Sequence, residues 1–510
     1  MPSNPLDHSN VLDINLTVHD ELADKFYEAA NLGGYKNKRL TQLQVLLANL
    51  ISNHQTDPDL YTALSLADGF YKPNSRYNSY SIGKGFINLI RELAEGDWLE
   101  LHKGFIDRKS KISRRSRIKP TEKTLKLLDD LQAYSHLIAR APNTECIILR
   151  DEDKKDIEYK DTHTEITART HLTAYNNLLH KTLIDHPEFP TEGIPLKDGR
   201  TFMINTSDKF VRRVFNHTSF EWNGRFYGGW WQRTPKAYRS GIHLDGSSTC
   251  EIDFSAIHMV LLYAIAGIDY WNDVGTDPYL LDDFEQSDEI RSLLKVIVLV
   301  SVNAISRTQA LEALRYKIRT TDREEFEWFI EGGYDLEDIL NRFVKKHKPI
   351  QSSFFSSNTF SVMKIDAEIA EYIINHFTDK GTPVLAIHDS FLINRIYEGD
   401  LQRVMQTACN KVAVREVNQP ITNTKVGFEG TNISGFTHLL RTDRDFMIDM
   451  LFKNKYSDRE VQRRKDVKSY KQLVGTEDYY SAQSERYLAV LISYSLLRPF
   501  HNQPITGSTQ

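Results

Sequence analysis

Two apolar, strand-like segments that are far apart in the chain each lead into an aspartate. In CEIDFSAIHMVLLYAIAG, a strand is expected to end at Asp253, and an apolar helix follows it directly. In VLAIHDSFLINR, two strand-like runs flank Asp389, which the pattern places at the tip of a hairpin. Strands and long helices that alternate in this way pack as a sheet covered by helices, and they bring carboxylates from separate strands side by side.

Two neighbouring carboxylates of this kind suit divalent cations. Carboxylate and carbonyl oxygens are preferred ligands of Mg²⁺, and two ions about 3.5–4 Å apart stabilise the attacking and leaving oxygens of phosphoryl transfer. Each aspartate alone is ambiguous, because an Asp after a strand is also a common turn residue or helix cap. The pair therefore predicts a two-metal phosphoryl-transfer site at Asp253 and Asp389.

The stretch between the two aspartates contains a predicted helix with two cations. In EIRSLLKVIVLVSVNAISRTQALEAL, Arg291 and Lys295 are four residues apart and share one helix face, and Asn303 lies close to that face. These cations suit a triphosphate, although they could instead pair with the preceding acidic run DDFEQSDE. Asp366, near the start of the later helix NTFSVMKIDAEIAEYIINHF, either contacts nucleic acid or pairs with a neighbouring cation.

In this order, the segments resemble the family A DNA polymerases and the single-subunit RNA polymerases of phages and mitochondria. The resemblance covers roughly residues 220–400. DFSAIH is similar to the DYSQIE motif of the DNA enzymes, which implies that Asp253 and the main-chain carbonyl of Phe254 are metal ligands. IHDSF resembles the third motif in its RNA-polymerase form, which implies that Asp389 is the second ligand and that His388 lies near the primer end.

The same resemblance gives roles to three cations. RSLLKVIVLVSVNA is similar to the R-x-x-x-K fingers helix of both groups, so Arg291 and Lys295 would bind the incoming triphosphate. Upstream, EWNGRFYGG resembles the D-x-x-G-R segment of the RNA polymerases, which implies that Arg225 contacts the template or the hybrid.

The chain departs from the family pattern where the sugar of the nucleotide is sensed. Asn303-Ala304 stands where the fingers helix of the family continues with Tyr-Gly. His258 stands at the position of the Glu in DYSQIE, a bulky gate against the 2′-hydroxyl. Because a bulky ring disfavours a ribonucleotide by steric clash, His258 favours DNA synthesis, whereas the HDSF and NGRFY segments resemble RNA polymerases.

Residues 37–135 have the order of elements of a winged helix-turn-helix. An amphipathic helix, a Gly turn, a strand, a basic loop, a second strand and a helix capped by Thr121 follow one another there. The basic loop would meet DNA phosphates, or it is an ordinary solvated loop. Its cations are Arg108, Lys109, Lys111, Arg114, Arg115, Arg117 and Lys119.

Composition limits the partners and the compartment. The formal net charge of −5 over 510 residues means that local basic surfaces must hold any nucleic acid. Cys146, Cys250 and Cys409 are far apart and form no zinc or disulfide pattern. The start shows no secretory pattern, and no apolar run is long enough to span a membrane, so we expect a cytoplasmic protein.

These features together predict an α+β fold: a polymerase right hand, with an α/β palm and helical fingers and thumb, plus an N-terminal winged helix-turn-helix. The expected division is an N-terminal segment, a winged-helix-like module, a helical, thumb-like connector, the palm and fingers, and a C-terminal helical extension. Their ranges are 1–36, 37–135, 136–219, 220–400 and 401–510.

The expected activity is extension of a strand from nucleoside triphosphates on a nucleic-acid template, starting from a primer or nascent strand. A DNA-directed DNA polymerase is favoured, and a single-subunit RNA polymerase or primase-like enzyme is the alternative. Two Mg²⁺ ions are expected, for which Mn²⁺ could substitute. A catalytically inactive DNA-binding initiator and a metal-dependent nuclease are the rival functions, although a nuclease has no need of triphosphate-binding cations.

Overall fold

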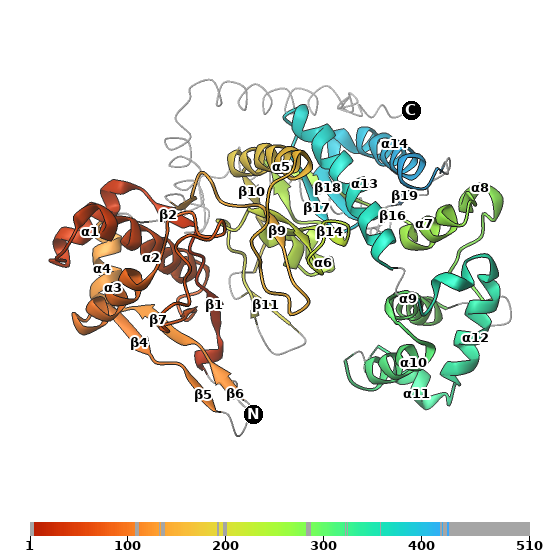
Figure 1. The fold of residues 1–510 in the computed structure, drawn as a ribbon, viewed down its shortest axis with the longest axis horizontal. Coiled ribbons are helices and arrows are strands. Elements are labelled where there is room, and N and C mark those ends of the chain that lie inside the picture. The colour runs from red at the N-terminus through yellow and green to blue at the C-terminus, as the bar shows by residue number, and fades with distance from the viewer. Residues whose placement is uncertain are drawn as a thin grey trace, which may run out of the picture.

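The computed structural model describes the chain from residue 5 to residue 427 with short gaps. The gaps are 108–111, 132, 134–137, 191–192, 197–200, 282–286, 322, 324, 357–358, 419–420 and 422–425. Three regions follow one another across the molecule: an N-terminal module, a central sheet with its helices, and a group of helices around α9 to α12 (Figure 1).

The N-terminal module is a small sheet backed by helices. Its strands lie in the order β1-β3-β7-β4, with β1 parallel to β3 and the other pairs antiparallel. Buried apolar side chains from the helices and the sheet form one core. The elements are β1 (Ser9–Val11), β2 (Leu16–Val18), α1 (Asp20–Ala29), α2 (Lys36–Thr56), β3 (Tyr61–Leu64), α3 (Lys84–Glu95), β4 (Leu99–His102), β5 (Phe105–Asp107), β6 (Ile112–Arg114), β7 (Ser116–Pro120), α4 (Glu122–Asp130) and β8 (Ile138–Arg140).

The predicted order within this module is confirmed. Helix α3 buries Phe86 and Ile90 on one face and ends at Gly96, after which β4 begins. The β5–β6 hairpin occupies the predicted wing, and β7 leads into α4. The Thr121 hydroxyl accepts a hydrogen bond from the Thr124 N–H at 3.4 Å, which caps α4 as the sequence predicts.

The expected separate segment at residues 1–36 is wrong. Strands β1 and β2 and helix α1 all belong to the module, because Leu12, Val18 and Phe26 are buried in its core. Strand β1 joins the sheet through a parallel pairing with β3, and β2 pairs with β8. Such pairings link residues far apart in the sequence, so short polar strands give little local signal.

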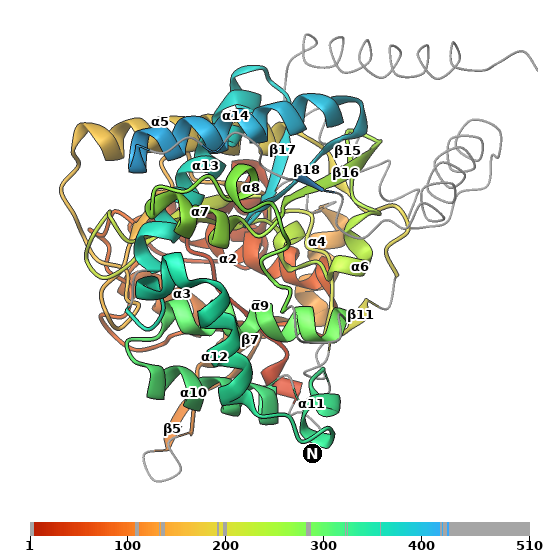
Figure 2. The ribbon, with the colours of Figure 1, turned by 90° about the vertical axis from the view of Figure 1, so that its right-hand side faces the viewer.

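The central sheet positions the predicted aspartates. Its strands lie in the order β10-β15-β16-β18-β17, and β19 pairs with β16. Helices α13 and α14 pack on it and α7 packs against both helices, and Figure 2 shows α14 running along the top of this layer. The elements are β10 (Ile184–Asp185), β15 (His243–Leu244), β16 (Ser247–Phe254), α7 (Ile257–Ile265), α13 (Thr359–Asp379), β17 (Val384–Ile387), β18 (Ser390–Asn394), α14 (Glu398–Val417) and β19 (Val426–Gly427).

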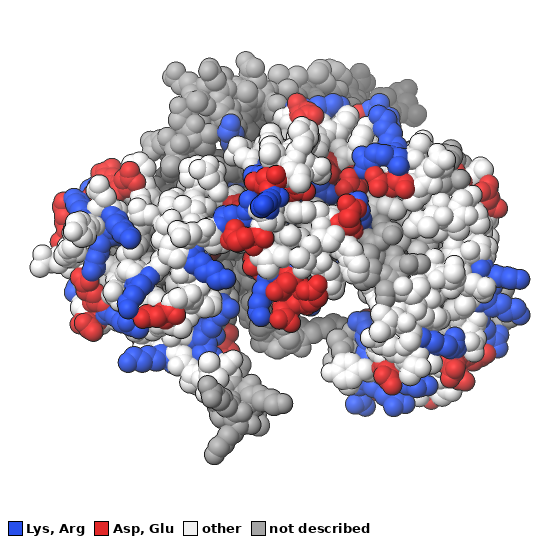
Figure 3. Space-filling model, in the orientation of Figure 1, with Lys and Arg blue, Asp and Glu red and all other residues white. Residues whose placement is uncertain are grey.

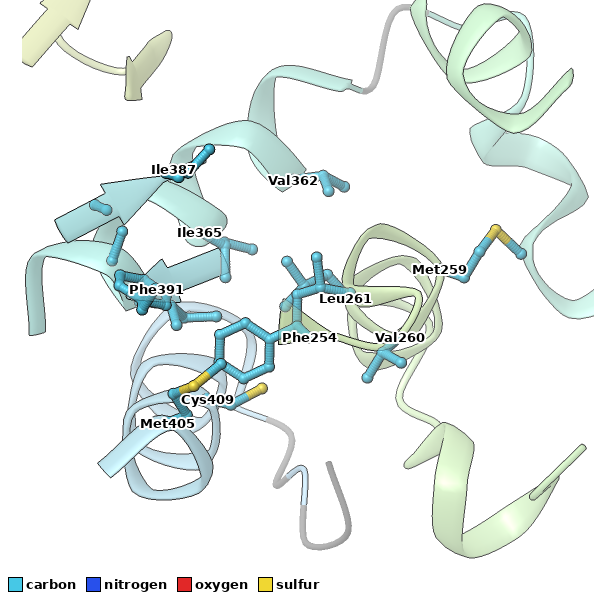
Figure 4. Packing of buried hydrophobic residues seen from close by; sticks show 14 of the residues in the cluster. Phe254, Met259, Val260, Leu261, Val362, Ile365, Ile387, Phe391, Met405 and Cys409 are labelled. Atoms are coloured by element: carbon cyan, nitrogen blue, oxygen red, sulfur yellow. The ribbon is translucent and has the colours of Figure 1, made fainter. Parts of the chain in front are cut away.

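Side chains along β16 alternate between the two faces of the sheet, which places Asp253 on the face opposite the core. Ile252 and Phe254 are buried, while Asp253 between them is half-buried on the opposite face. Figure 4 shows the Phe254 ring packed towards Met405 and Cys409 of α14. The predicted strand, aspartate and apolar helix around residue 253 are confirmed, as is the hairpin that carries Asp389.

A helical group is inserted between α7 and α13. The helix predicted to carry Arg291 and Lys295 is confirmed as α9, whose N-terminus is capped by Ser287. The Ser306 side chain caps α10 and the Asp335 side chain caps α12 in the same way. The helices are α8 (Tyr270–Asp273), α9 (Asp288–Asn303), α10 (Arg307–Tyr316), α11 (Glu327–Glu331) and α12 (Leu336–Lys346).

The expected helical connector at 136–219 is wrong. The long helix described there is α5, and the other elements described there are short strands. The Tyr175 hydroxyl donates to the Val384 carbonyl at 2.6 Å, so α5 packs on the central sheet. Strand β13 pairs with both β9 and β14, and β14 packs on α13. These elements are β9 (Ile147–Leu149), α5 (His163–Lys181), β11 (Ile194–Pro195), β12 (Thr201–Phe202), β13 (Val211–Phe215) and β14 (Asn223–Gly228).

Residue 220 is therefore no boundary of the fold, and neither is residue 400, because α14 spans it and packs on the sheet. The expected C-terminal extension lies outside the described residues from 428 onward. No helix within the described residues is long and apolar enough to cross a bilayer. The remaining short elements are η1 (Pro5–Asp7), η3 (Trp230–Arg233), α6 (Lys236–Arg239), η4 (Lys317–Thr321), η5 (Lys348–Ser353) and η6 (Arg395–Tyr397).

Candidate active site

Asp253 and Asp389 lie at the same end of two paired strands. Asp253 on β16 stands opposite Ser390 on β18, and Asp389 is the turn residue directly before Ser390. His388 begins that turn with φ of 56°, the left-handed region that a tight hairpin requires. Ala256, also at φ of 55°, turns the chain sharply from β16 into α7. The geometry thus brings together the two aspartates that the sequence predicted to meet.

A third carboxylate lies on the same face of β16. Glu251 is two residues before Asp253, and side chains at this spacing project from one face of a strand. One Glu251 oxygen accepts hydrogen bonds from the Ser390 hydroxyl at 2.7 Å and from Arg239 Nη1 at 3.0 Å. Arg239 therefore balances Glu251, and the pair forms one wall of the acidic site.

Arg225, Asp366 and His258 form a buried polar cluster beside the aspartates. Arg225 donates to Asp366 Oδ2 from Nε at 2.9 Å and from Nη2 at 2.6 Å. His258 Nε2 lies 2.7 Å from Arg225 Nη2 and 3.7 Å from Asp366 Oδ2. Burial would raise the pKa of Asp366, but His258 and Arg225 outweigh it and hold that pKa below its ordinary value. Of the two interpretations of Asp366, the structure favours pairing with a neighbouring cation.

The electrostatics of Asp389 differ from those of Asp366. Burial and the nearby negative charge of Asp366 raise the pKa of Asp389, and His258 and Arg225 oppose them only in part. Burial also lowers the pKa of His388, with Arg225 acting in the same direction. A cation beside Asp389 would relieve this accumulation of negative charge.

Tyr279 connects the sheet to the helical group. Its side chain is buried, and burial raises the pKa of its hydroxyl; the charges of Asp389 and Asp253 act in the same direction, while Arg291 opposes them. The Arg291 guanidinium lies 5.3 Å from the Tyr279 ring centroid. The charges of Arg291, at the start of α9, and of both aspartates therefore act on the same buried hydroxyl. Sequence reasoning missed Tyr279, although it stands in the GTDPYLL segment shortly before α9.

Arg291 and Lys295 share one face of α9, but their surroundings differ. Arg291 Nε donates to Asp277 Oδ2 at 3.0 Å and is half-buried, whereas Lys295 is exposed. Arg291 therefore pairs with an acid other than those of the run DDFEQSDE. Asn303 ends the helix about 18 Å along its axis from Arg291, at about 1.5 Å per residue. The structure thus groups Arg291 and Lys295 and places Asn303 apart from them.

The donor atoms at the aspartates fit magnesium. Asp253, Asp389 and the Phe254 carbonyl offer oxygen alone, which suits a hard cation such as Mg²⁺ or Mn²⁺. No group of three or more His, Cys, Asp or Glu side chains in the described ranges has the arrangement of a metal site. Mg²⁺ commonly takes one or two carboxylates and completes its shell with water and substrate phosphates, so this donor set fits it.

Most of the described wing cations already have partners. Arg114 donates to Asp7 Oδ1 from Nε at 3.1 Å and from Nη2 at 2.8 Å, and Lys119 donates to Asp59 at 3.0 Å. Arg117 is bound to main-chain carbonyls, and Arg115 is exposed. The loop residues Arg108, Lys109 and Lys111 lie outside the described residues.

Comparisons with known proteins give a distant structural likeness. The sequence matches no protein-family model and no curated protein. Among solved structures, the chain is similar to the POL domain of Pol1 from M. smegmatis in complex with DNA primer-template and dNTP. The identity is 13%, the TM-score is 0.28, and the match covers 83% of this chain and 69% of that chain. Because this likeness is so distant, the geometry described above has to carry any functional assignment.

Proposed function

We propose that the chain is a template-directed nucleotidyltransferase that extends a nucleic-acid strand from nucleoside triphosphates. The observation that carries the proposal is the pair Asp253 and Asp389 at the same end of two paired strands, with Tyr279 beside Arg291 of α9 and close enough for both aspartates to act on its hydroxyl. A hydrolytic site needs the carboxylates but has no use for a second set of cations aimed at a triphosphate. The combination therefore favours nucleotidyl transfer.

The aspartates act as ligands in this proposal. Asp253, Asp389 and the Phe254 carbonyl would hold two magnesium ions. When bound, these ions supply activation of a primer 3′-hydroxyl and neutralisation of the triphosphate charge. Glu251 is given a supporting role, because Arg239 balances its charge and one of its two oxygens accepts from both Arg239 and Ser390.

Arg291 and Lys295 bind the triphosphate. They lie four residues apart on α9, so both reach a ligand that approaches this helix face from the sheet. Asp277 orients the Arg291 guanidinium through Nε, which leaves its other nitrogen atoms to donate to phosphate oxygens. Lys295 contributes an exposed charge one turn further along the helix.

The cluster beside Asp389 contacts the primer, the template and the sugar. His388 is exposed at the hairpin tip, 6.1 Å from the Tyr227 ring, where it would meet the primer end. Arg225, held by Asp366, would contact the template, and His258 would stand against the 2′-hydroxyl of a ribonucleotide. DNA synthesis is the favoured activity, with RNA synthesis as the alternative.

A primer-extension assay tests the function. A labelled primer–template with magnesium is offered dNTPs and rNTPs in separate reactions, and a third reaction contains no nucleotide. The expected result is extension by wild type with dNTPs. Asp253→Ala and Asp389→Ala should each abolish that extension. The matched control is Asp153→Ala, which removes an exposed acid from a turn far along the chain. Primer shortening without nucleotides would indicate a nuclease, and the absence of any product with folded protein would indicate an inactive scaffold.

A further inference from the structure

An ion cluster links the N-terminal module to the central region, through an Asp13 that is half-buried and an Arg212 that is exposed. Asp13 of the module accepts from Arg140 at 2.8 Å and lies 3.4 Å from Arg212 of β13. Burial would raise the pKa of Asp13, but the two arginines outweigh it and hold that pKa below its ordinary value. Strand β13 belongs to the sheet that packs on α13, so this contact ties the module to the region that carries the aspartates.

A second contact fixes the orientation of the module. The Arg76 guanidinium lies 3.5 Å from the Tyr159 ring centroid and donates to Asp161 at 3.2 Å. The neighbouring Tyr77 hydroxyl donates to the Ile157 carbonyl at 2.8 Å.

A third contact joins α2 to the loop before β13. The Ser52 hydroxyl accepts from the Asn205 amide at 2.8 Å and lies 3.0 Å from the Ser207 hydroxyl. The three contacts lie at separate places on the module, and the orientation in this structure satisfies all of them together. The wing is therefore held at a fixed place relative to the acidic site.

The wing side of the module carries a basic pocket. Its volume is about 440 Å³, and three arginines and a lysine contribute to its walls. Phe105 and Ile106 on β5 are exposed, Ile106 to 78%, so this strand presents apolar side chains to solvent beside these cations. The pocket is lined by Leu6, Leu101, His102, Lys103, Phe105, Arg114, Arg115 and Arg117.

Asp7 indicates what this pocket binds. One Asp7 oxygen accepts two N–H bonds from Arg114, in the way that an arginine holds an oxygen of a phosphate. The Asp7 side chain is 55% exposed, so a phosphate can replace it at small cost. The pocket thus suits a backbone oxyanion.

The wing lies across from the helical group that bears α9. Figure 1 shows the β5–β6 hairpin extending from the module on the same side of the molecule as α10 and α11. The space-filling view shows the molecule hollowed between them, beneath the central sheet (Figure 3). A strand that is extended at the sheet and bound by the wing would pass through this hollow.

We propose that the wing pocket grips the duplex part of the primer–template behind the growing end, so that the N-terminal module acts as a fixed clamp for the polymerase site. This proposal rests on the proposed function. The partner is duplex nucleic acid bound through its phosphates, and the clamp replaces the thumb that the sequence assigned to residues 136–219.

The test measures the dissociation constants of primer–templates with short and long duplex sections. The clamp variant is Lys103→Ala with Arg115→Ala, because both residues are exposed and line the pocket. The control is Lys25→Ala with Lys36→Ala, which removes two exposed cations from α1 and α2. In wild type, affinity should rise with duplex length, and the clamp variant should reduce that rise on the order of tenfold, while the control should not.

Asp7→Asn provides a change in the opposite direction. Removing the internal competitor of Arg114 should strengthen binding of the long duplex by about 1.5- to 5-fold, the scale of a surface ion pair. Equal losses on short and long duplexes in the clamp variant would overturn the proposal, as would a wild-type affinity that is independent of duplex length. Extension by wild type on the same substrates is recorded in parallel. Its absence would sink the polymerase function itself, a result distinct from failure of the clamp.

Discussion

The acids at the sheet edge and the cations of the wing are both charged clusters. They differ in whether neighbouring groups of opposite charge balance them. Burial and the charge of Asp366 raise the pKa of Asp389, so its ionised form is disfavoured without a cation. In the wing, Arg114 is matched by Asp7 and Lys119 by Asp59, all near the surface. Removing one partner of a buried ion pair costs about 3–5 kcal/mol, whereas a surface pair contributes about 0–1 kcal/mol. On the proposed function, the acidic site would take a cation as its ligand, whereas the wing would bind phosphates by exchanging ion-pair partners.

The largest effect should come from removing an aspartate at the sheet edge. Asp253→Ala or Asp389→Ala should abolish nucleotide incorporation while the protein stays folded, because each change removes a ligand shared by the catalytic metals. Incorporation rates and circular dichroism melting curves measure the two parts of this prediction. Activity within about tenfold of wild type, with normal magnesium dependence, would contradict the assignment.

Next in size is loss of the buried partner of Arg225. Asp366→Ala leaves the Arg225 charge buried without its carboxylate, so unfolding should become easier by about 3–5 kcal/mol. Urea denaturation measures this change. Asp338→Ala, which breaks an exposed pair with Arg342 at 2.8 Å, should cost at most about 1 kcal/mol. Similar costs for the two variants would remove the distinction between buried and surface charges.

The sequence predicted the parts of the site that depend on local patterns. Asp253 and Asp389 were found because alternation and a strand–turn–strand pattern are visible within a few residues. The pairing of Arg225 with Asp366 spans 141 positions, and no local pattern shows it. The role of Glu251 was missed for the same reason, since its partner Ser390 lies 139 positions away.

The same contrast explains the fold. Helices α3, α4 and α9 have apolar spacing within one window of sequence, α4 and α9 are also capped by a side chain, and all three were predicted. Strand β9 has three residues, and it is stabilised by parallel pairing with the distant β13. Strand β1 pairs with β3 in the same way. Because such pairing depends on distant partners, the region 136–219 was mistaken for a helical connector.

Arg291 and Lys295 allow a comparison between a half-buried and an exposed cation on the same helix. Replacing either with Ala should lower kcat/KM for the nucleotide. The expected loss of transition-state stabilisation is about 1.5–3 kcal/mol, the value of a charged hydrogen bond. Steady-state kinetics with one correct nucleotide measures it. The exposed Arg315 on α10 provides the control, and Arg315→Ala should leave kcat/KM within about twofold of wild type. An unchanged kcat/KM for both α9 variants would remove the triphosphate role.

His258 tests whether the buried cluster also selects the sugar. His258→Gly should admit ribonucleotides better and shift the discrimination by about 1–3 kcal/mol, the scale on which a pocket senses one small group. Competition between dNTPs and rNTPs on one template measures it. If the ring only supports Arg225, which lies 2.7 Å from it, incorporation of dNTPs and of rNTPs should fall equally. A wild-type preference for rNTPs would reject the gate and place RNA synthesis first.

The smallest effect is expected in the wing, where the charges are exposed. Neutralising Arg114, Arg115 and Arg117 would flatten the slope of log K against log salt by up to about 2.7 if each met one phosphate. Asp7 already balances Arg114, and a main-chain carbonyl accepts from Arg117, so the exposed Arg115 should account for the first 0.9 or so by itself. Titrations of duplex DNA at several salt concentrations compare Arg115→Ala with Lys25→Ala, whose pair lies on α1. Equal slopes for these two variants and wild type would leave the wing as an ordinary solvated surface and restrict nucleic-acid binding to the central sheet and its helices.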